Sequence, residues 1–351
     1  MIFFLLILLA IIFKSIRFYP QNQFNRQYLS LEHTNVIKGI FVILVIFLHS
    51  SQYLSLSGMY DEPYMIFKHF MGQMIVSVFL FYSGYGVMTS LSKKGFSYVK
   101  TIPTRRLIKV LINFDIAVLL YLLLDFALGQ SFDLKTILLS LIAWENIGNS
   151  NWYILAILGL YLITFIAFFP IKWFDSKIAL YIYALLLTIL SVVFVFFEMK
   201  MGKESYFFNT IILYPLGIWY CLLKPSLDSL ILRNDFVYSL FAALLTIALY
   251  ISYTQSTIKG IEGYSLWAIC FTLAVIAVTM KMEFQSPLLQ WFGEHIFSVY
   301  ILQRIPMMVL HHFGVSYSHK YFFIILSIVI TVVIAQVFDT LTGKMWKKIM
   351  R

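Results

Sequence analysis

Charged residues are scarce in this chain, and their scarcity excludes most classes of soluble protein. Only 12% of its 351 residues are Asp, Glu, Lys or Arg, whereas 61% are hydrophobic. Soluble domains typically have about 25% charged and about 45–50% apolar residues. Apolar runs of about 18 residues recur throughout the sequence, which is the pattern of membrane-spanning helices. The composition therefore predicts an all-α polytopic membrane protein that resides in the lipid bilayer.

Cysteine is nearly absent, and no acidic tract balances the basic residues. Cys221 and Cys270 both lie in apolar stretches, so a disulfide framework is not expected. The net charge of +10 does not indicate nucleic-acid binding, because the Lys and Arg residues fall in particular loops. No internal repeat or linker divides the sequence, and we predict one domain over residues 1–351.

Eleven apolar stretches are predicted to span the membrane in one bundle. They are residues 2–19, 36–54, 71–91, 107–128, 152–170, 178–198, 206–223, 236–253, 264–280, 289–310 and 321–339. The stretch 134–144 is too short to cross and is expected to be interfacial or re-entrant. The helix at 2–19 has no basic segment before its apolar run, so we expect a retained anchor and not a cleaved signal peptide.

The distribution of basic residues predicts the orientation of these helices. With the N-terminus outside, nineteen of the 26 Lys and Arg residues fall on the cytoplasmic side. They lie in residues 14–38, 92–109, 171–177 and 224–235, at Lys281, and in the C-terminal tail. Cytoplasmic loops generally carry this excess of positive charge. The sequence thus predicts an outside N-terminus and a cytoplasmic C-terminus in a bacterial-type cell membrane.

One predicted helix carries two ionisable residues that share a face. Lys38 stands eleven residues before His49, which is about three helical turns or about 16 Å. An imidazole well inside an apolar span is costly, and such groups usually face a cavity or a partner. His49 is therefore a candidate general base or nucleophile, although a histidine bonded within the core is the alternative. For Lys38 the alternative is an ordinary basic residue at a cytoplasmic helix end.

This pair, together with three other segments, resembles the acyltransferase-3 family of integral-membrane O-acyltransferases. Lys38 stands where that family usually has Arg, with ten residues between it and the matching His49. The other similar segments are "SVFLFYSGYGVM" at 77–88, "TIPTRRLIK" at 101–109 and "WFGEHIFSVYILQRIPM" at 291–307. The helix at 2–19 is extra, because the motif helix often comes first in the family.

The resemblance implies an acyl-CoA-dependent enzyme, and in particular an O-acetyltransferase that moves acetyl from acetyl-CoA to a hydroxyl of a glycan or polysaccharide precursor. Catalysis would then involve His49 and Lys38. The acyl donor would be bound by Lys38, by the small-residue segment Ser83, Gly84 and Tyr85, and by Arg105 and Arg106 at a helix start, where anions bind well. Close helix packing and positive-inside bias are the alternative readings of these residues.

The acceptor is expected on the outer side. Asn151, Trp152 and Tyr153 follow the outer loop, where amide and aromatic side chains suit sugars but also enrich membrane interfaces. Arg304 lies inside an apolar helix, with Pro306 expected to kink it. We expect Arg304 either to orient the acyl group or acceptor or to pair with a buried acid such as Asp115 or Asp125.

Other functions remain open from the sequence. No metal site is predicted, because neither acidic nor Cys ligands accompany His311, His312 and His319. A transporter for a lipid-linked sugar would fit the apolar spans equally well, but the chain shows no paired broken helices in two related halves. A glycan polymerase would be expected to have a larger outer loop than residues 129–151.

Overall fold

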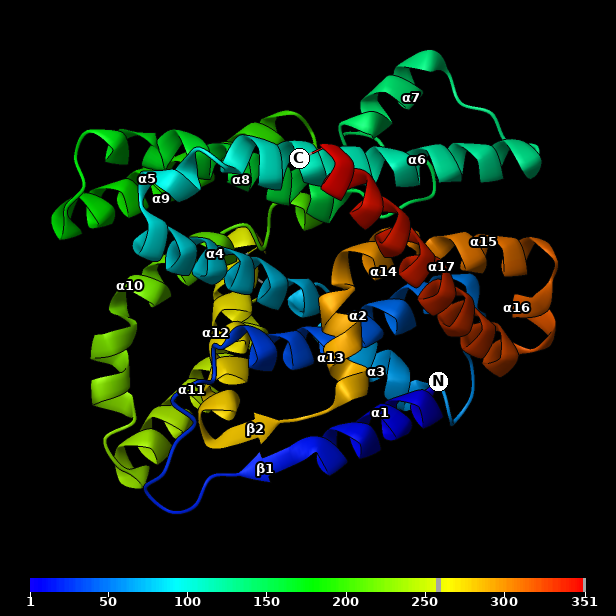
Figure 1. Ribbon diagram of the computed structural model, residues 1–351. Coiled ribbons are helices and arrows are strands. Elements are labelled where there is room, and N and C mark those ends of the chain that lie inside the picture. The colour runs from blue at the N-terminus through cyan, green and yellow to red at the C-terminus, as the bar shows by residue number, and fades with distance from the viewer. Residues whose placement is uncertain (257–259, 350–351) are drawn as a thin grey trace.

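A computed structural model describes residues 1–256 and 260–349 and shows a helical bundle with one short strand pair (Figure 1). In the described residues, eight helical segments are long and apolar enough to cross a membrane. They are Leu31–Tyr53, Glu62–Lys94, Phe96–Ala127, Trp152–Lys172, Lys177–Lys200, Asp235–Ser256, Gly260–Lys281 and Lys320–Ile349. The polytopic all-α prediction is therefore confirmed, while the total of eleven spans and the orientation of the termini stay predictions.

The three remaining predicted spans are shorter or interrupted. Helix α1 (Ile2–Ser15) has 14 residues, and α10 (Leu213–Ile231) begins seven residues later than the predicted stretch at 206. The predicted span 289–310 is divided into α13 (Pro287–Glu294), α14 (Ile296–Leu302) and α15 (Arg304–His312). The short apolar stretch at 134–144 forms α7 (Leu134–Leu141).

Pro306 explains why the predicted span 289–310 is interrupted between α14 and α15. Pro306 has no N–H to bond the Leu302 carbonyl four residues earlier, and its ring would clash with that carbonyl. The α14 helix accordingly ends at Leu302, and the neighbouring Ile301 carbonyl accepts a hydrogen bond from the Tyr121 hydroxyl at 3.0 Å. The kink predicted from Pro306 is therefore present, and it sets α14 and α15 apart.

The strand pair was not predicted. Strands β1 (Ile16–Phe18) and β2 (Met282–Phe284) pair antiparallel, with Arg17 opposite Glu283. They join the end of α1 to the end of α12 (Gly260–Lys281), helices that are far apart in the sequence. A three-residue strand beside a long apolar helix carries no alternating pattern long enough to identify it.

Contacts between loops agree with the side of the membrane predicted for each loop. The Lys281 ammonium bonds the Asp235 carboxylate at 2.7 Å, and Arg26 donates to the Leu232 carbonyl at 3.3 Å. These residues belong to three of the stretches predicted to be cytoplasmic. At the opposite end of the bundle, Lys320 bonds Asp61 at 2.7 Å.

The core of the bundle is formed by α2 (Leu31–Ser50) and α4 (Met74–Lys94), which are mostly buried. By contrast, α9 (Lys177–Lys200) and α11 (Asp235–Ser256) expose most of their apolar side chains, as expected of helices that face lipid. Figure 1 shows α2 in the interior beside α13. The helix that carries Lys38 and His49 is thus surrounded by protein.

Candidate active site

Helix α2 places Lys38 and His49 against separate cavities. The Ser30 side chain caps the helix by accepting a hydrogen bond from the His33 N–H at 3.2 Å, which satisfies one of the free donors at a helix start. Apolar side chains fill the interval between the two ionisable residues. Each of the two lines a cavity of its own, and we name these the Lys38 cavity and the His49 cavity.

Two glycines bring α2 into backbone contact with α13. A Cβ added at Gly39 would lie 1.8 Å from the Leu289 carbonyl oxygen, and one added at Gly293 would lie 1.8 Å from the Asn35 carbonyl oxygen. Both values are far below any real van der Waals contact, so only glycine fits at either position. Since α13 leads into α14 and α15, this contact determines where the residues after 295 lie relative to His49.

The His49 cavity has a volume of about 480 Å³ and contains most of the predicted acceptor-side residues. His49, Asn151, Trp152 and Arg304 line it together, although they come from α2, from the start of α8 (Trp152–Phe168) and from α15. The remaining polar lining residues include Gln52, Ser150 and Tyr300. The structure therefore brings residues more than 250 positions apart to one site.

The imidazole of His49 is available for proton transfer. The side chain is partly buried, and its Nδ1 atom has no hydrogen-bond partner among the described residues. The Gln303 side chain lies near the ring, and the centroid of the Tyr300 ring lies 6.3 Å from the imidazole centroid. A ring with an unpaired nitrogen suits a general base or a nucleophile.

Arg304 bonds neutral groups and not the acids considered from the sequence. Its guanidinium donates to Ser150 Oγ at 2.8 Å, to Gln52 Oε1 at 2.6 Å and to the Tyr53 hydroxyl at 3.5 Å. Neither Asp115 nor Asp125 contacts it: both lie on α6 (Lys109–Ala127), where each has a carboxylate oxygen without a partner in the described chain. The pairing with a buried acid is wrong, and Arg304 faces the His49 cavity instead.

Near the other end of α2, the Lys38 cavity contains most of the predicted donor-binding residues. Lys38, Ser83, Tyr85 and Arg106 line a volume of about 450 Å³. A neighbouring space of about 390 Å³, the Arg105 cavity, shares Ser83 and Arg106 with it and adds Arg105. These two cavities together form a cationic, aromatic-lined space.

Two expectations for this region are corrected. Gly84 does not line either cavity, because it packs on α10, where an added Cβ would lie 2.1 Å from the Tyr214 carbonyl oxygen. The Arg105 N–H is already bonded to the Thr101 carbonyl at 2.8 Å, within a π-helical turn over Pro103–Ile108 that precedes α6. The positive charge at this place comes from the arginine side chains and not from a free helix end.

Tyr153 also lies on the side opposite to the one predicted. It lines the Lys38 and Arg105 cavities, whereas Trp152 lines the His49 cavity. Consecutive residues of an α-helix differ in direction by about 100°, because the helix has 3.6 residues per turn. The first residues of α8 therefore serve two different cavities.

Two tyrosine rings separate the cavities. The Tyr153 and Tyr300 ring centroids are 5.6 Å apart, and Tyr300 lines both the His49 cavity and the Arg105 cavity. We name this pair the tyrosine wall. The Tyr300 ring also neighbours His49, so the tyrosine wall connects the cationic space with the surroundings of the imidazole.

Sequence reasoning missed four residues of this site. Gln52, Ser150, Tyr300 and Gln303 were not singled out. Gln303 stands beside Arg304 in "YILQRIP", and a buried amide inside an apolar helix is the kind of signal that could have identified it. Tyr300 gives no such signal, because an aromatic residue in a spanning helix is usually a packing residue.

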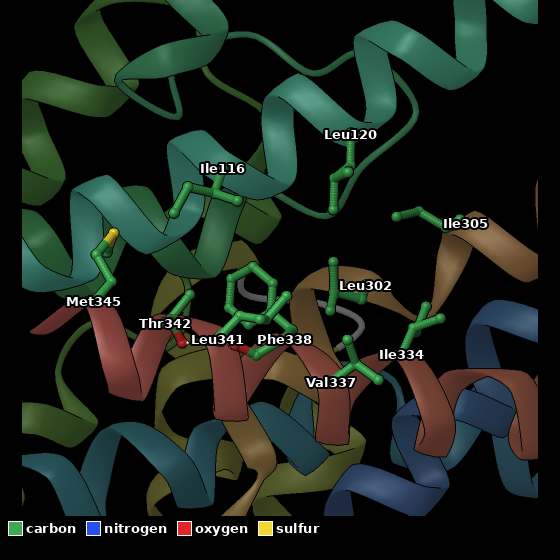
Figure 2. Close-up of a pocket in the computed structure, with 10 residues that line it drawn as sticks. All are labelled: Ile116, Leu120, Leu302, Ile305, Ile334, Val337, Phe338, Leu341, Thr342 and Met345. Atoms are coloured by element: carbon green, nitrogen blue, oxygen red, sulfur yellow. Dashed lines mark hydrogen bonds between the residues drawn. The ribbon is translucent and has the colours of Figure 1, made fainter.

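A larger cavity of about 530 Å³ lies elsewhere and has no reactive group. Figure 2 shows its side chains, which come from α6, from α14 and α15, and from α17 (Lys320–Ile349). Thr342 is its only polar lining residue in the described chain, and Leu120, Val337 and Leu341 are exposed at 41%, 51% and 61%. The groove therefore faces lipid and is not a reaction site.

The comparison with protein families agrees with this arrangement. Residues 33–339, nearly the whole chain, match the family described as "Acyltransferase domain". The match includes Lys38, His49, Arg106 and Arg304 and leaves α1 outside. No curated protein and no solved structure matches the chain. The chain belongs to the acyltransferase-3 family and is a multi-pass membrane acyltransferase.

Proposed function

We propose that this protein is an O-acetyltransferase of the cell membrane. It takes acetyl from cytoplasmic acetyl-CoA and transfers it to a hydroxyl of a cell-surface polysaccharide or glycan precursor. The observation that carries the proposal is that one helix bears a cation in the Lys38 cavity and an imidazole in the His49 cavity, with the tyrosine wall lining both sides of the boundary between them.

The Lys38 and Arg105 cavities suit the acyl donor. Lys38, Arg105 and Arg106 offer positive charge to the CoA phosphates, with Lys38 acting as a point charge where an arginine would grip with two bonds. Ser83 and the neighbouring aromatic side chains leave a narrow space for the pantetheine arm. In this proposal the thioester points toward the tyrosine wall, and the phosphates lie on the side predicted to be cytoplasmic.

At the His49 cavity the imidazole removes the proton of the acceptor hydroxyl. The oxygen then attacks the thioester carbonyl, the C–O bond forms, and the C–S bond breaks. The CoA thiolate leaves and takes the proton from the imidazolium, so the imidazole returns to its neutral state. In the alternative sequence His49 attacks first, and a transient acyl-imidazole passes the acetyl group to the hydroxyl.

The test is transfer from radiolabelled acetyl-CoA by the purified, detergent-solubilised chain. His49→Ala should lower the rate by about a hundredfold or more, the usual contribution of a positioned general base. The matched control is His33→Ala, since His33 lies on the same helix but lines a different cavity. Full activity in His49→Ala, or an equal loss in His33→Ala, would remove the catalytic role of His49.

A further inference from the structure

The His49 cavity is cationic, and nothing in the described chain balances its charge. Lys68 and Arg304 line it, whereas no Asp or Glu among the described residues does so. The three oxygens that Arg304 bonds belong to uncharged side chains. The Lys68 ammonium group makes no hydrogen bond and no ion pair with the described residues, although the Lys68 carbonyl accepts from the Gly72 N–H at 3.0 Å. Cations that are partly removed from water are normally paired with an anion.

Two amide donors add to this imbalance. The Asn149 side chain is 7% exposed, and its Oδ1 accepts from the Ile147 N–H at 3.2 Å, which orients its Nδ2 donors. That Nδ2 atom, like the Nε2 atom of Gln73, is buried without a partner in the described residues. Both residues line the His49 cavity. Buried N–H groups are almost always hydrogen-bonded, so these donors point to a bound acceptor of hydrogen bonds.

Acidic residues are absent from the described lining of the His49 cavity but not from the surrounding end of the bundle. Asp61 bonds the Lys320 ammonium at 2.7 Å and also the Met1 ammonium at 2.9 Å. Carboxylates therefore neutralise cations where the fold requires it, but they do not line the cavity that contains His49.

We infer that the acceptor is an anionic glycan, whose carboxylate or phosphate group is bound by Arg304 and Lys68 while a neighbouring hydroxyl faces His49. Charge-assisted hydrogen bonds from a guanidinium to an anionic oxygen are among the strongest in proteins. The inference rests on the proposed function, because it assigns the chemical class of the acceptor for that same site.

The experiment measures binding and not acyl transfer. A glucuronic-acid oligosaccharide, the same oligosaccharide after reduction of its carboxyl groups, and a phosphorylated oligosaccharide are each titrated against the solubilised full chain without acyl-CoA. The acidic sugar should bind about tenfold more tightly than its reduced form, which is the effect of one charge-assisted hydrogen bond. A comparison of the two acidic sugars distinguishes carboxylate from phosphate.

The variants locate this preference. Lys68→Gln and Arg304→Gln should each remove most of the discrimination between the acidic and the reduced sugar. Because the Lys68 ammonium group has no partner among the described residues, Lys68→Gln should leave the fold intact, and a loss of discrimination in this variant would not be due to misfolding. The matched control is Lys135→Gln. It makes the same charge change in the 129–151 connection, at a residue that does not line the cavity.

Equal affinity for the acidic and the reduced sugar, tighter binding of the reduced sugar, or no measurable binding of any of the three would overturn the inference. Discrimination that survives in Lys68→Gln and Arg304→Gln alike would also contradict it. If the acidic sugar binds as expected but the wild-type chain transfers no acetyl from labelled acetyl-CoA, the anion site stands and the proposed function fails.

Discussion

The cavities on the two sides of the tyrosine wall are both cationic, but their other linings differ. Beside Lys38 and Arg106 the lining is aromatic, and Arg106 lies over the Tyr161 ring at 5.7 Å. Around His49 the lining is rich in amides and contains no aliphatic alcohol other than Ser150. The comparison shows that the imidazole belongs to the amide-rich space and Lys38 to the aromatic-lined space; under the proposed function the first would take the acceptor and the second the acyl donor.

The change expected to have the largest effect abolishes both cavities at once. Gly293→Val would force a side chain into the Asn35 carbonyl oxygen and move α13 away from α2. We expect loss of transfer, loss of binding of both substrates, and a lower midpoint of thermal unfolding, because overpacking costs about 1–3 kcal/mol or more. The control is Gly343→Val, since an added Cβ there meets no atom within 4 Å. Normal binding of either substrate by Gly293→Val would contradict this account.

The next change separates the two cavities. Lys38→Gln combined with Arg106→Gln should raise the KM for acetyl-CoA by about a hundredfold or more, because each of the two cations contributes about 1.5–3 kcal/mol to a charged hydrogen bond. The acceptor affinity should stay within about twofold of the wild type. Steady-state kinetics and acceptor titration measure the two quantities. A rise in acceptor Kd as large as that in KM would show that the two spaces are not independent.

Removing the wall should join the cavities and give a smaller effect. Tyr300→Ala takes away the ring that lines both the His49 cavity and the Arg105 cavity. We expect hydrolysis of acetyl-CoA without acceptor to rise severalfold, because water would reach the thioester. Release of free thiol measures this rate. Tyr300→Phe keeps the ring and should keep hydrolysis at the wild-type rate; an increase there would point to the hydroxyl and not to the ring.

The smallest effect concerns stability and leaves the site intact. Burial alone would raise the pKa of Asp61, but hydrogen bonds and charge from the Lys320 and Met1 ammonium groups outweigh it and hold this pKa below its ordinary value. The stabilisation is therefore complete above about pH 4, near the unfolded-state pKa, and is lost as the pH falls through the lower folded-state pKa.

Thermal unfolding of Lys320→Met against pH tests this linkage. The variant should be less stable by about 1–2 kcal/mol at neutral pH. Its disadvantage should shrink as the medium is acidified below about pH 4. Acetyl transfer at neutral pH should be unchanged, because Lys320 does not line the His49 cavity. A stability deficit that is constant with pH would contradict the role of Asp61.

Much of the architecture was accessible from periodicity and hydropathy, because lipid requires long apolar helices whatever their neighbours are. The eleven-residue spacing of Lys38 and His49 and the break at Pro306 follow from helix geometry alone. The direction of a side chain around its helix does not. Tyr153 was assigned to the acceptor side and Gly84 to the donor site, yet only the packing of α8 and of α4 on α10 determines where each one points.

The hydrogen-bond partners of Arg304 could not be predicted from the sequence for a similar reason. One of the two roles expected of Arg304 was pairing with a buried acid such as Asp115 or Asp125, because a charge inside an apolar helix suggests an opposite charge. The break at Gln303 turns α15 toward Ser150 and Gln52, which lie in connections between helices. No local pattern reports how short helix pieces are oriented after a break.

The tyrosine wall has a consequence for the cell as well as for the reaction. A protein that is hollow from both faces of a membrane would, if its hollows joined, conduct protons and small ions down the electrochemical gradient. Under the proposed function, the two rings, whose centroids are 5.6 Å apart, would stand between these hollows and keep ions from passing. The reaction would then draw on one aqueous phase and deliver to the other without a leak of charge.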